Sequence, residues 1–381
     1  MLFLFLLSVS RPLCAADSFP SFDAVTIDGD VGKVCYAVTI ADVNGDGEND
    51  IVAVTESRVL WFESPTWTSH TIIDGATPTD NVCIAAHDID GDGNIDFALG
   101  AGWTKKGTIH WLSRGSSLDD PWNVHFIGEE PWTHRMRFAD VLGKGTPQLV
   151  VSPLNATSGN GVRLTAFEIP EDPADDRWPT TVLSDDLNRM HNHFHIDLDG
   201  DKIVDTLTAS REGVNLIRRA GQDWQQIKLG DGMSADQPDD SGAGEIKVGQ
   251  LSDGKRFIAT VEPMHGHTLA VYVEPATATD RWQRHVVDTG FVRGHAIWPA
   301  DMDGDGDDDI VFGHSDTPET FGVIVYQADS ADGREWTKHV VDAGTMACED
   351  LVVEDLTGDG FPDIVAGGRA THNVKLYVQR R

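Results

Sequence analysis

The sequence has little of three things: cysteine, basic residues and long hydrophobic runs. Only four of its 381 residues are cysteines, too few for the dense disulfide framework that stabilises small secreted domains. Lysine and arginine number 29 against 62 acidic residues, and the net charge of -33 argues against nucleic acid or an anionic membrane as a partner. Beyond the first few residues, no run is long and apolar enough to cross a bilayer. We therefore expect a soluble protein, most simply a monomer, that binds neither.

The first sixteen residues resemble a secretory signal peptide. An apolar run covers Leu2 to Val9, and Cys14-Ala15-Ala16 supplies small residues suited to cleavage. We expect residues 1–16 to be removed, residues 17–381 to form a single domain, and the protein to be secreted or periplasmic. The remaining cysteines, Cys35, Cys83 and Cys348, are odd in number, so they cannot all pair within one chain and their pairing stays open.

A nonapeptide that begins at Asp301 organises the rest of the chain. Its four carboxylates, at Asp301, Asp303, Asp305 and Asp309, stand at positions 1, 3, 5 and 9, and the run Ile310 to Gly313 follows at once. Such an oxygen-rich loop is typical of calcium, which accepts six to eight oxygen ligands. The EF-hand is the obvious alternative, but its pattern requires a glutamate at position 12 and flanking helices. Here the flanks predict strands, so the loop joins a hairpin.

The nonapeptide recurs along the chain. Four further copies keep most of the ligands, and they supply Asp42, Asn44, Asp46 and Asp50; Asp88, Asp90, Asp92 and Asp96; Asp197, Asp199, Asp201 and Asp205; and Asp355, Asp359 and Asp363. Two copies, which start at Asp140 and Gln250, keep the rhythm but lose the ligands. We predict several structural Ca²⁺ sites at the complete copies.

The spacing of these copies predicts the fold. The starts at 42, 88, 140, 197, 250, 301 and 355 define seven units of about fifty residues, each with signals for four short strands. Together with 38 glycines for tight turns, this indicates an all-β, seven-bladed β-propeller with calcium-binding hairpin loops. The last unit ends after its third strand, whereas Phe22 to Asp28 resembles a fourth, so we expect the N-terminal strand to close the ring.

Counting back six residues from each loop start gives one position per blade at the mouth of the innermost strand, on the face opposite the calcium loops. These positions hold Tyr36, Val82, His134, His191, Gly244, His295 and Glu349, and the next ones hold Ala37, Cys83, Arg135, Asn192, Glu245, Ala296 and Asp350. Convergent polar groups in a concave site are the usual signal of a binding or active site. His191, His193 and His195 alternate along one strand, so they point to one side of it and could line the channel together.

From this ring and the neighbouring turns we select two groups of candidates. The catalytic candidates are His134, Arg135, His191, His265 and His295. The substrate-binding candidates are Tyr36, Trp103, Asn192, Arg211, Glu245, His267 and Arg369. By contrast, His70, His125, His285 and His339 recur at one position of the outer strand, so we interpret them as structural surface residues.

The nonapeptide with its Ile-Val continuation resembles the FG-GAP or VCBS repeat. The stretches Trp132 to Phe138, Met190 to Phe194, Gly244 to Ile246, Glu262 to Gly266 and Gly367 to Val374 resemble, more narrowly, the propeller part of aldos-2-ulose dehydratase and of related rhamnose-glucuronate lyases. Both relatives remove a proton next to a carbonyl or carboxylate and expel an oxygen from the β carbon. The dehydratase continues into cupin domains, whereas the present sequence ends with the propeller, so we expect no chemistry here that depends on a cupin.

The resemblance implies a carbon–oxygen lyase that acts on a carbohydrate, by β-elimination on a uronate-containing glycan or by dehydration of a keto-sugar. Histidines could act as base or acid, Arg135 could hold a carboxylate, and a further divalent cation could be bound at the mouth by histidines and Glu245. The sequence does not assign base against acid. The alternative is a non-catalytic, calcium-stabilised propeller that binds a carbohydrate or a protein, because fold does not fix function.

Overall fold

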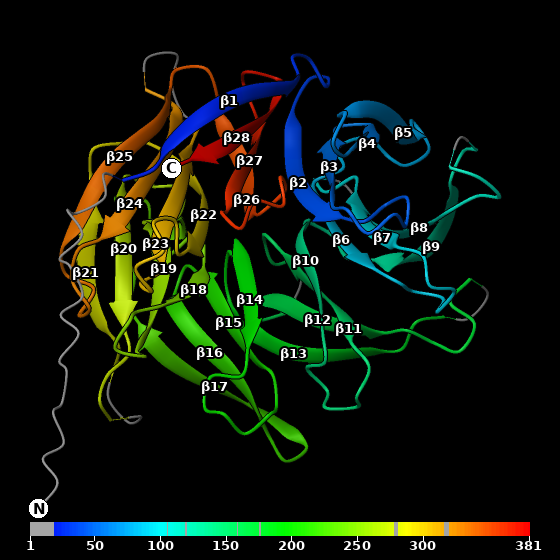
Figure 1. The fold of residues 1–381 in the computed structure, drawn as a ribbon. Helices are drawn as coiled ribbons and strands as arrows, with labels where there is room; N and C mark the ends of the chain where they lie inside the picture. The colour runs from blue at the N-terminus through cyan, green and yellow to red at the C-terminus, as the bar shows by residue number, and fades with distance from the viewer. Residues whose placement is uncertain are drawn as a thin grey trace, which may run out of the picture.

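The computed structural model describes residues 19–104, 106–118, 120–157, 159–174, 177–277, 281–315 and 320–381. Within these ranges the chain forms seven four-stranded antiparallel sheets, which follow one another around a ring as the blades of an all-β propeller (Figure 1). The expected signal peptide at residues 1–16 lies outside the described residues.

The first three blades comprise β2 (Cys35–Ala41), β3 (Asp50–Thr55), β4 (Arg58–Glu63) and β5 (Thr68–Asp74); β6 (Cys83–His87), β7 (Asp96–Ala101), β8 (Thr108–Ser113) and β9 (Asn123–Glu129); and β10 (Thr133–Ala139), β11 (Gln148–Pro153), β12 (Val162–Glu168) and β13 (Thr180–Leu187). The fourth and fifth comprise β14 (Asn192–Ile196), β15 (Asp205–Ser210), β16 (Gly213–Ala220) and β17 (Asp223–Gly230); and β18 (Lys247–Gln250), β19 (Arg256–Glu262), β20 (Thr268–Val273) and β21 (Gln283–Asp288). The last two comprise β22 (Gly294–Ala300), β23 (Asp309–His314), β24 (Gly322–Ala328) and β25 (Trp336–Ala343); and β26 (Cys348–Glu354), β27 (Asp363–Gly368), β28 (Val374–Arg380) and β1 (Ser21–Asp28). A 3-10 turn, Pro238–Asp240, precedes β18.

The hydrophobic core lies between neighbouring blades. Middle strands such as β3 and β7 are buried along their whole length, since both of their faces pack against another sheet. The cluster that joins the first and last blades, for example, contains Val38, Ile51 and Leu376. Cys35, Cys83 and Cys348 are buried free thiols, so packing rather than disulfides holds the described residues together. No helix of the described residues is long and apolar enough to span a membrane.

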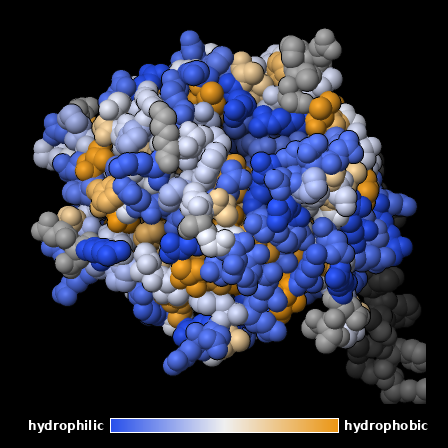
Figure 2. Space-filling model, turned by 180° about the vertical axis from the view of Figure 1, so that it is seen from behind, coloured by the Kyte–Doolittle hydropathy of each residue, from blue (hydrophilic) through white to orange (hydrophobic). Residues whose placement is uncertain are grey.

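The exposed surface is mostly hydrophilic. In the view of Figure 2 hydrophobic side chains are scattered among hydrophilic ones. The larger exposed apolar residues include Val25, Phe126, Val182, Val286 and Val340, which lie on the outermost strands of five different blades. Their separation around the ring leaves these residues as isolated surface positions rather than one apolar patch.

The two ends of the chain meet in one sheet. Strand β1 pairs antiparallel with β28, with Ser21 opposite Arg380 and Thr26 opposite Lys375, and Figure 1 shows the two strands side by side. The seventh blade therefore takes its outermost strand from residues more than 300 positions away in the sequence.

A register shift at the start of the innermost strand shapes the mouth of the propeller. In four blades the pairing skips one residue, which leaves Tyr36, His134, His295 and Glu349 unpaired between their neighbours. Such a β-bulge turns a side chain away from the normal alternation of the strand. The bulged residues stand at the mouth, whereas the hairpin loops with the acidic nonapeptides lie at the other ends of the same strands, as the pairing of Ala41 with Asp50 shows.

Candidate functional site

A cavity of about 80 Å³ opens at the mouth end of the innermost strands. Its walls combine histidine, arginine, glutamate and aromatic side chains from six blades, and they are Tyr36, Val82, Trp103, His134, Arg135, Leu154, His265, Arg293, His295, Glu349 and Arg369. Five of the seven mouth positions counted from the sequence repeat are therefore in this lining, and a sixth, His191, is in ring contact with it.

Three mouth histidines are oriented in the same way. In each, Nδ1 faces the backbone carbonyl at the equivalent position of the next blade: His134 to His191 at 3.0 Å, His191 to Gly244 at 3.1 Å, and His295 to Glu349 at 2.5 Å. A carbonyl can only accept, so Nδ1 carries the proton in all three rings. In the neutral rings Nε2 then keeps its lone pair, which is available to a proton or a metal ion.

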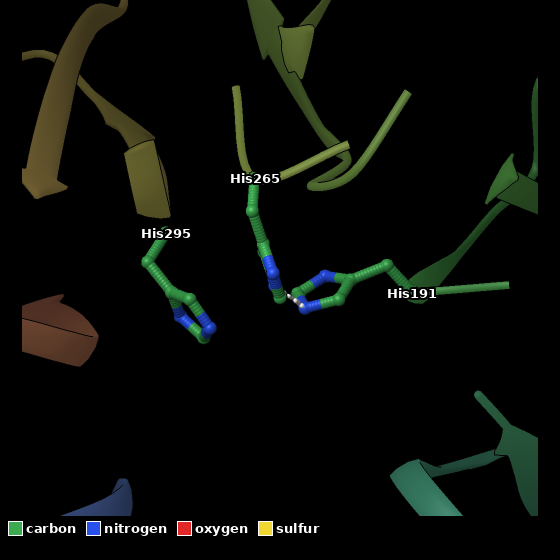
Figure 3. A group of neighbouring side chains, drawn as sticks. All are labelled: His191, His265 and His295. Atoms are coloured by element: carbon green, nitrogen blue, oxygen red, sulfur yellow. Dashed lines mark hydrogen bonds between the residues drawn. The ribbon is translucent and has the colours of Figure 1, made fainter. Parts of the chain in front are cut away.

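The imidazoles of three residues converge at the mouth, and Figure 3 shows them: His191, His265 and His295. The Nε2 atoms of His191 and His265 are 2.5 Å apart, and the ring centroids of His265 and His295 are separated by 4.7 Å. One nitrogen from each of the three residues lies within 4.8 Å of the others, a spacing that fits a single divalent cation. The carbonyl-bound Nδ1 atoms of His191 and His295 match the outer-shell hydrogen bonding that usually orients metal-binding histidines.

Burial keeps the mouth histidines neutral. It lowers the pKa of His134, His265 and His295 well below the usual range, and neighbouring positive charges, among them Arg135 or Arg293, add to the effect. The pKa of His191 is lowered as well, again by burial, although Glu245 opposes the shift. Near neutral pH these rings are therefore uncharged, so each has a basic nitrogen that can bind a metal ion or accept a proton, and none is an imidazolium that could act as an acid.

Glu349 is the acidic group of the mouth cavity. Its Oε1 lies 2.5 Å from Nη1 of Arg369 and 3.5 Å from Nε2 of His295, and its Oε2 lies 3.9 Å from Nη1 of Arg293. Burial raises the pKa of Glu349, even though the arginines pull in the opposite direction. Above this group the Arg369 guanidinium lies 5.9 Å from the centre of the Tyr36 ring.

Glu245 supports the site from below. Its Oε1 lies 2.8 Å from Nδ1 of His191 and 3.5 Å from Nη2 of Arg135, and its Oε2 accepts a hydrogen bond from Asn192 at 2.5 Å. Burial opposes ionisation of Glu245, but the close contact with His191 and the charge of Arg135 outweigh it and lower its pKa to about 2. Glu245 is thus an ionised carboxylate that holds His191 and Arg135 in place.

The other sequence candidates are divided between the cavity and the surface. Trp103 lines the cavity, with its ring 5.8 Å from that of His134 and 5.5 Å from that of Trp132. Arg211 is not in the lining, because its guanidinium pairs with Asp239 at 2.8 Å. His267 is exposed and also lies outside the lining.

The expectation that His191, His193 and His195 line the channel together was wrong. His193 is fully buried between blades, with Nδ1 3.0 Å from the hydroxyl of Ser152, and His195 contacts the Thr206 hydroxyl at 3.0 Å. Asn192, not His193, lines the axial channel. The reason is an irregularity at the start of β14. The backbone amide of His191 donates to the carbonyl of Ala209, and the next residue, Asn192, is also paired with Ala209. The alternation of side chains along the strand therefore restarts at Asn192.

Two charged residues of the cavity were missing from the sequence-based selection. Glu349 stands at the mouth position of the seventh blade, so the repeat already marked it, but it was not chosen as a candidate. Arg293 lies in the turn before β22, outside the repeated positions, and no motif marks it.

The acidic loops on the opposite face suit a cation. In three loops one carboxylate oxygen from each of three aspartates lies within 4.8 Å of the others, and these are Asp88, Asp90 and Asp96; Asp197, Asp199 and Asp201; and Asp301, Asp303 and Asp305. Asp88 Oδ1 is buried and has no hydrogen-bond partner among the described residues. Burial raises the pKa of Asp96 to about 7 and that of Asp309 to about 8, a cost that a bound cation would remove.

In the fourth blade an arginine enters the acidic loop. Arg218 on β16 binds Asp205 through two hydrogen bonds of 2.8 and 2.6 Å, and its Nη1 lies 2.9 Å from Asp199. Lys202 replaces the second glycine of this loop and adopts a φ of 71°, a region that favours glycine. The degraded loop of the third blade also has its own cation, because Lys144 pairs with Glu168.

Comparison with known proteins connects the site to a family. Residues 106–275 match the model described as aldos-2-ulose dehydratase, beta-propeller domain, and residues 42–99 and 301–366 match the FG-GAP-like repeat. The aldos-2-ulose dehydratase of Phanerodontia chrysosporium is 29% identical over 231 residues, which cover 55% of this chain and 26% of that enzyme. The match thus spans about a quarter of the relative's length.

Solved structures support the fold alone. Two crystal structures of BBS1N in complex with ARL6DN, soaked with lead and with mercury, contain a chain similar to this one, with TM-scores of 0.56 and 0.57 and 12% identity. These matches cover 95% and 94% of this chain and 97% and 96% of the other. At this identity they carry no information on chemistry.

The first matched segment contains His134, His191, Glu245 and His265, which form one side of the mouth. The chain is therefore a seven-bladed β-propeller with FG-GAP-like repeats that resembles, over residues 106–275, the propeller domain of aldos-2-ulose dehydratase.

Proposed function

We propose that the protein is a carbohydrate-active carbon–oxygen lyase whose active site is the propeller mouth. The observation that carries the proposal is the convergence of four neutral histidines with Glu349 and Arg369 in one cavity. Structural stability does not require such a cluster, because buried polar groups are costly unless they are fully paired. The similarity to a dehydratase propeller supports the same class of reaction.

In this proposal His191, His265 and His295 hold a divalent cation. When bound, such an ion would polarise the carbonyl or carboxylate of the substrate and favour charge build-up on its oxygen. The role of Glu245 is to position His191 through the 2.8 Å contact with Nδ1.

His134 is our candidate base, because its Nδ1 proton is held by the His191 carbonyl and its Nε2 is left with a lone pair. It would take the proton from the carbon next to the carbonyl or carboxylate. The electrons of that C–H bond then form the carbon–carbon double bond as the bond from the β carbon to the leaving oxygen breaks. Glu349, whose pKa is raised by burial, is our candidate acid to protonate that oxygen.

The arginines at the rim suit a carboxylate or an oxyanion. Arg369 and Arg293 both face Glu349. A substrate carboxylate bound to Arg369 would weaken the ion pair between Arg369 and Glu349. Loss of that pairing favours the protonated form of Glu349, which the acid role requires. The cavity is smaller than a typical ligand pocket of about 300–1,000 Å³, so only the reacting end of a sugar would enter it.

The test is the ultraviolet absorbance of the conjugated double bond that elimination creates, measured with an aldos-2-ulose and with uronate-containing polysaccharides. We expect His134→Ala and Glu349→Gln to lower turnover by at least about a hundredfold, the scale of a lost acid or base. His70→Ala is the matched control, since His70 lies on the outermost strand β5, where its ring stacks on that of Trp61 at a centroid distance of 4.3 Å. Full activity of both mouth variants would place the chemistry elsewhere.

A second candidate function is carbohydrate binding without catalysis. It is favoured by the perpendicular pair of Trp103 and Trp132 beside the cavity, since aromatic side chains offer a surface for a sugar ring. Binding of a glycan without any change in absorbance, lost in Trp103→Ala but kept in His134→Ala, would support this function and contradict the lyase.

We further propose that the acidic loops bind Ca²⁺, except in the fourth blade, where Arg218 takes the place of the cation. We also propose that β1 closes the ring in solution, and that a monomer is exported to the periplasm or the medium. The buried, unpartnered Asp88 Oδ1 supports the first of these proposals and the pairing of β1 with β28 supports the second. Export depends on residues 1–16, which lie outside the described ranges, and stays a prediction.

A further inference from the structure

A second cavity of about 110 Å³ lies in the axial channel directly beneath the mouth. Its lining includes Arg135, Arg137, Asn192, Lys247, Trp298 and Asp350. It shares Arg135 and Val82 with the walls of the mouth cavity, so the two spaces adjoin. The proposed lyase chemistry uses none of Arg137, Lys247 and Asp350.

Positive charge is in excess around this cavity. Of its three cationic side chains, Arg135 pairs with Glu245 at 3.5 Å. Asp350 lines the cavity too, and its carboxylate accepts a hydrogen bond from the Val38 amide at 3.1 Å. The three cations and these two carboxylates leave one positive charge without a counter-charge.

The uncompensated charge belongs to the deeper pair, Arg137 and Lys247. Arg137 donates only to uncharged acceptors, the His193 carbonyl at 2.8 Å and the Asn192 side-chain oxygen at 3.2 Å. Among the described residues no carboxylate lies within 4.0 Å of the Lys247 ammonium, which instead faces the rings of Phe194 at 5.8 Å and Trp298 at 5.3 Å. Only 6% of Lys247 is exposed, so bulk solvent screens its charge little.

A buried cation without a partner is expensive, and this one occurs in a protein with a net charge of -33. Burial, reinforced by the charge of Arg137, lowers the pKa of Lys247 to about 7, although the carboxylates of Glu245 and Asp350 oppose the shift. A bound anion would keep the proton on Lys247 and satisfy the donors of both cationic groups.

We propose that this cavity is a binding site for one small monovalent anion, held between Arg137 and Lys247. A volume of about 110 Å³ admits a halide ion with water or a single carboxylate group, but not a whole sugar ring. The anion could come from the medium, as chloride, or from a uronate whose carboxylate reaches down from the mouth. The site does not depend on the proposed lyase activity, since it rests on charges that the chemistry does not use.

The direct test is chloride NMR line broadening, titrated on the whole protein at constant ionic strength. We expect excess broadening for the wild type, weaker binding by at least about tenfold in Lys247→Met, and recovery in Lys247→Arg. Lys106→Met is the matched control, because Lys106 is an exposed lysine, 79% accessible in its side chain, and should leave the broadening unchanged. Equal unfolding temperatures would show that the variants are folded.

Sodium glucuronate separates the two sources of the anion. If it removes the chloride broadening of the wild type, the site accepts a sugar carboxylate; if it does not, the site is one for inorganic anions, and the proposal holds in either case. Absence of excess broadening in the wild type, or broadening that Lys247→Met leaves unchanged, would overturn it. These outcomes are independent of turnover, so a failure of the lyase proposal would not be mistaken for a failure of this one.

Discussion

Nε2 of His191 and Nε2 of His265 lie 2.5 Å apart, although the two residues belong to different blades. His191 is fixed by the entrance of β14 and by Glu245, whereas His265 lies in the turn after β19 with a φ of 44°, a conformation uncommon outside glycine. Strained backbone is retained where the surrounding structure or function requires it. The turn thus brings one imidazole nitrogen against another in a place where a shared proton or a shared cation is needed.

The first prediction is that the mouth contains one equivalent of a divalent metal. His265→Ala should remove that equivalent, because it deletes one of three converging nitrogens, and metal content measured after dialysis would show the loss. His267→Ala is the matched control, since it lies two residues away but is exposed and outside the cavity. Identical metal content in the two variants would leave the three histidines as proton carriers alone.

The position of the mouth could be predicted from the sequence, but only some of the side chains that form its cavity could be. The repeat fixed the position six residues before each loop, and His134, His295 and Glu349 indeed share one cavity. Side-chain direction was harder, because the irregular pairing at the start of β14 restarts the alternation from which His193 was placed in the channel. A single sequence gives no signal for Arg293, which comes from an irregular turn. It gives none for Lys247 either, because the importance of Lys247 depends on the absence of a carboxylate partner among the described residues.

The second prediction concerns calcium and pH. Without metal, burial raises the pKa of Asp309 in the folded protein to about 8, well above its value of about 3.9 in an unfolded chain. The folded state then binds more protons between these values, so the stability of the chelated protein should fall as pH rises from about 4 to about 8. Calcium favours the carboxylate, so it should stabilise the protein more at the upper end of this range.

Unfolding temperatures with chelator or with excess calcium, measured across this pH range, would check the prediction. A tenfold change in proton affinity corresponds to about 1.4 kcal/mol, so an effect of at least that size is expected. Asp309→Asn removes the titrating group and should flatten the dependence in chelator. A calcium effect that is the same at every pH would contradict this account of the loop.

The third prediction is that the fourth acidic loop depends on Arg218 rather than on calcium. The side chain of Asp205 is almost completely buried, and its two hydrogen bonds to Arg218 satisfy the carboxylate without a metal. Arg218→Met should destabilise the protein in chelator by about 1.5–3 kcal/mol, the usual contribution of hydrogen bonds to a charged group. It should also raise the amount of bound calcium by one equivalent, because the loop then lacks its cation.

Arg219→Met is the matched control for this experiment. Arg219 is the next residue on β16, but its guanidinium donates to backbone carbonyls of Leu142 and Gly221 instead of a carboxylate. Its loss should leave the calcium stoichiometry unchanged. If Arg218→Met and the wild type bind equal amounts of calcium, the arginine is not acting in place of a cation.

The last prediction concerns the strand at the N-terminus. Deletion of residues 1–28 should expose the backbone edge of β28, whose residues Val374 to Arg380 are paired with β1 in the folded protein. It should also remove Phe22, which packs against the core between the sixth and seventh blades, and Phe19, whose ring stacks on His339 at 3.8 Å. An open edge rich in apolar residues is a template for pairing with another chain, so aggregation is the expected result.

Deletion of residues 1–16 alone is the control, and it should change neither the unfolding temperature nor the size measured by light scattering. A monomeric, equally stable product of the longer deletion would mean that the pairing of β1 with β28 does not hold the ring closed.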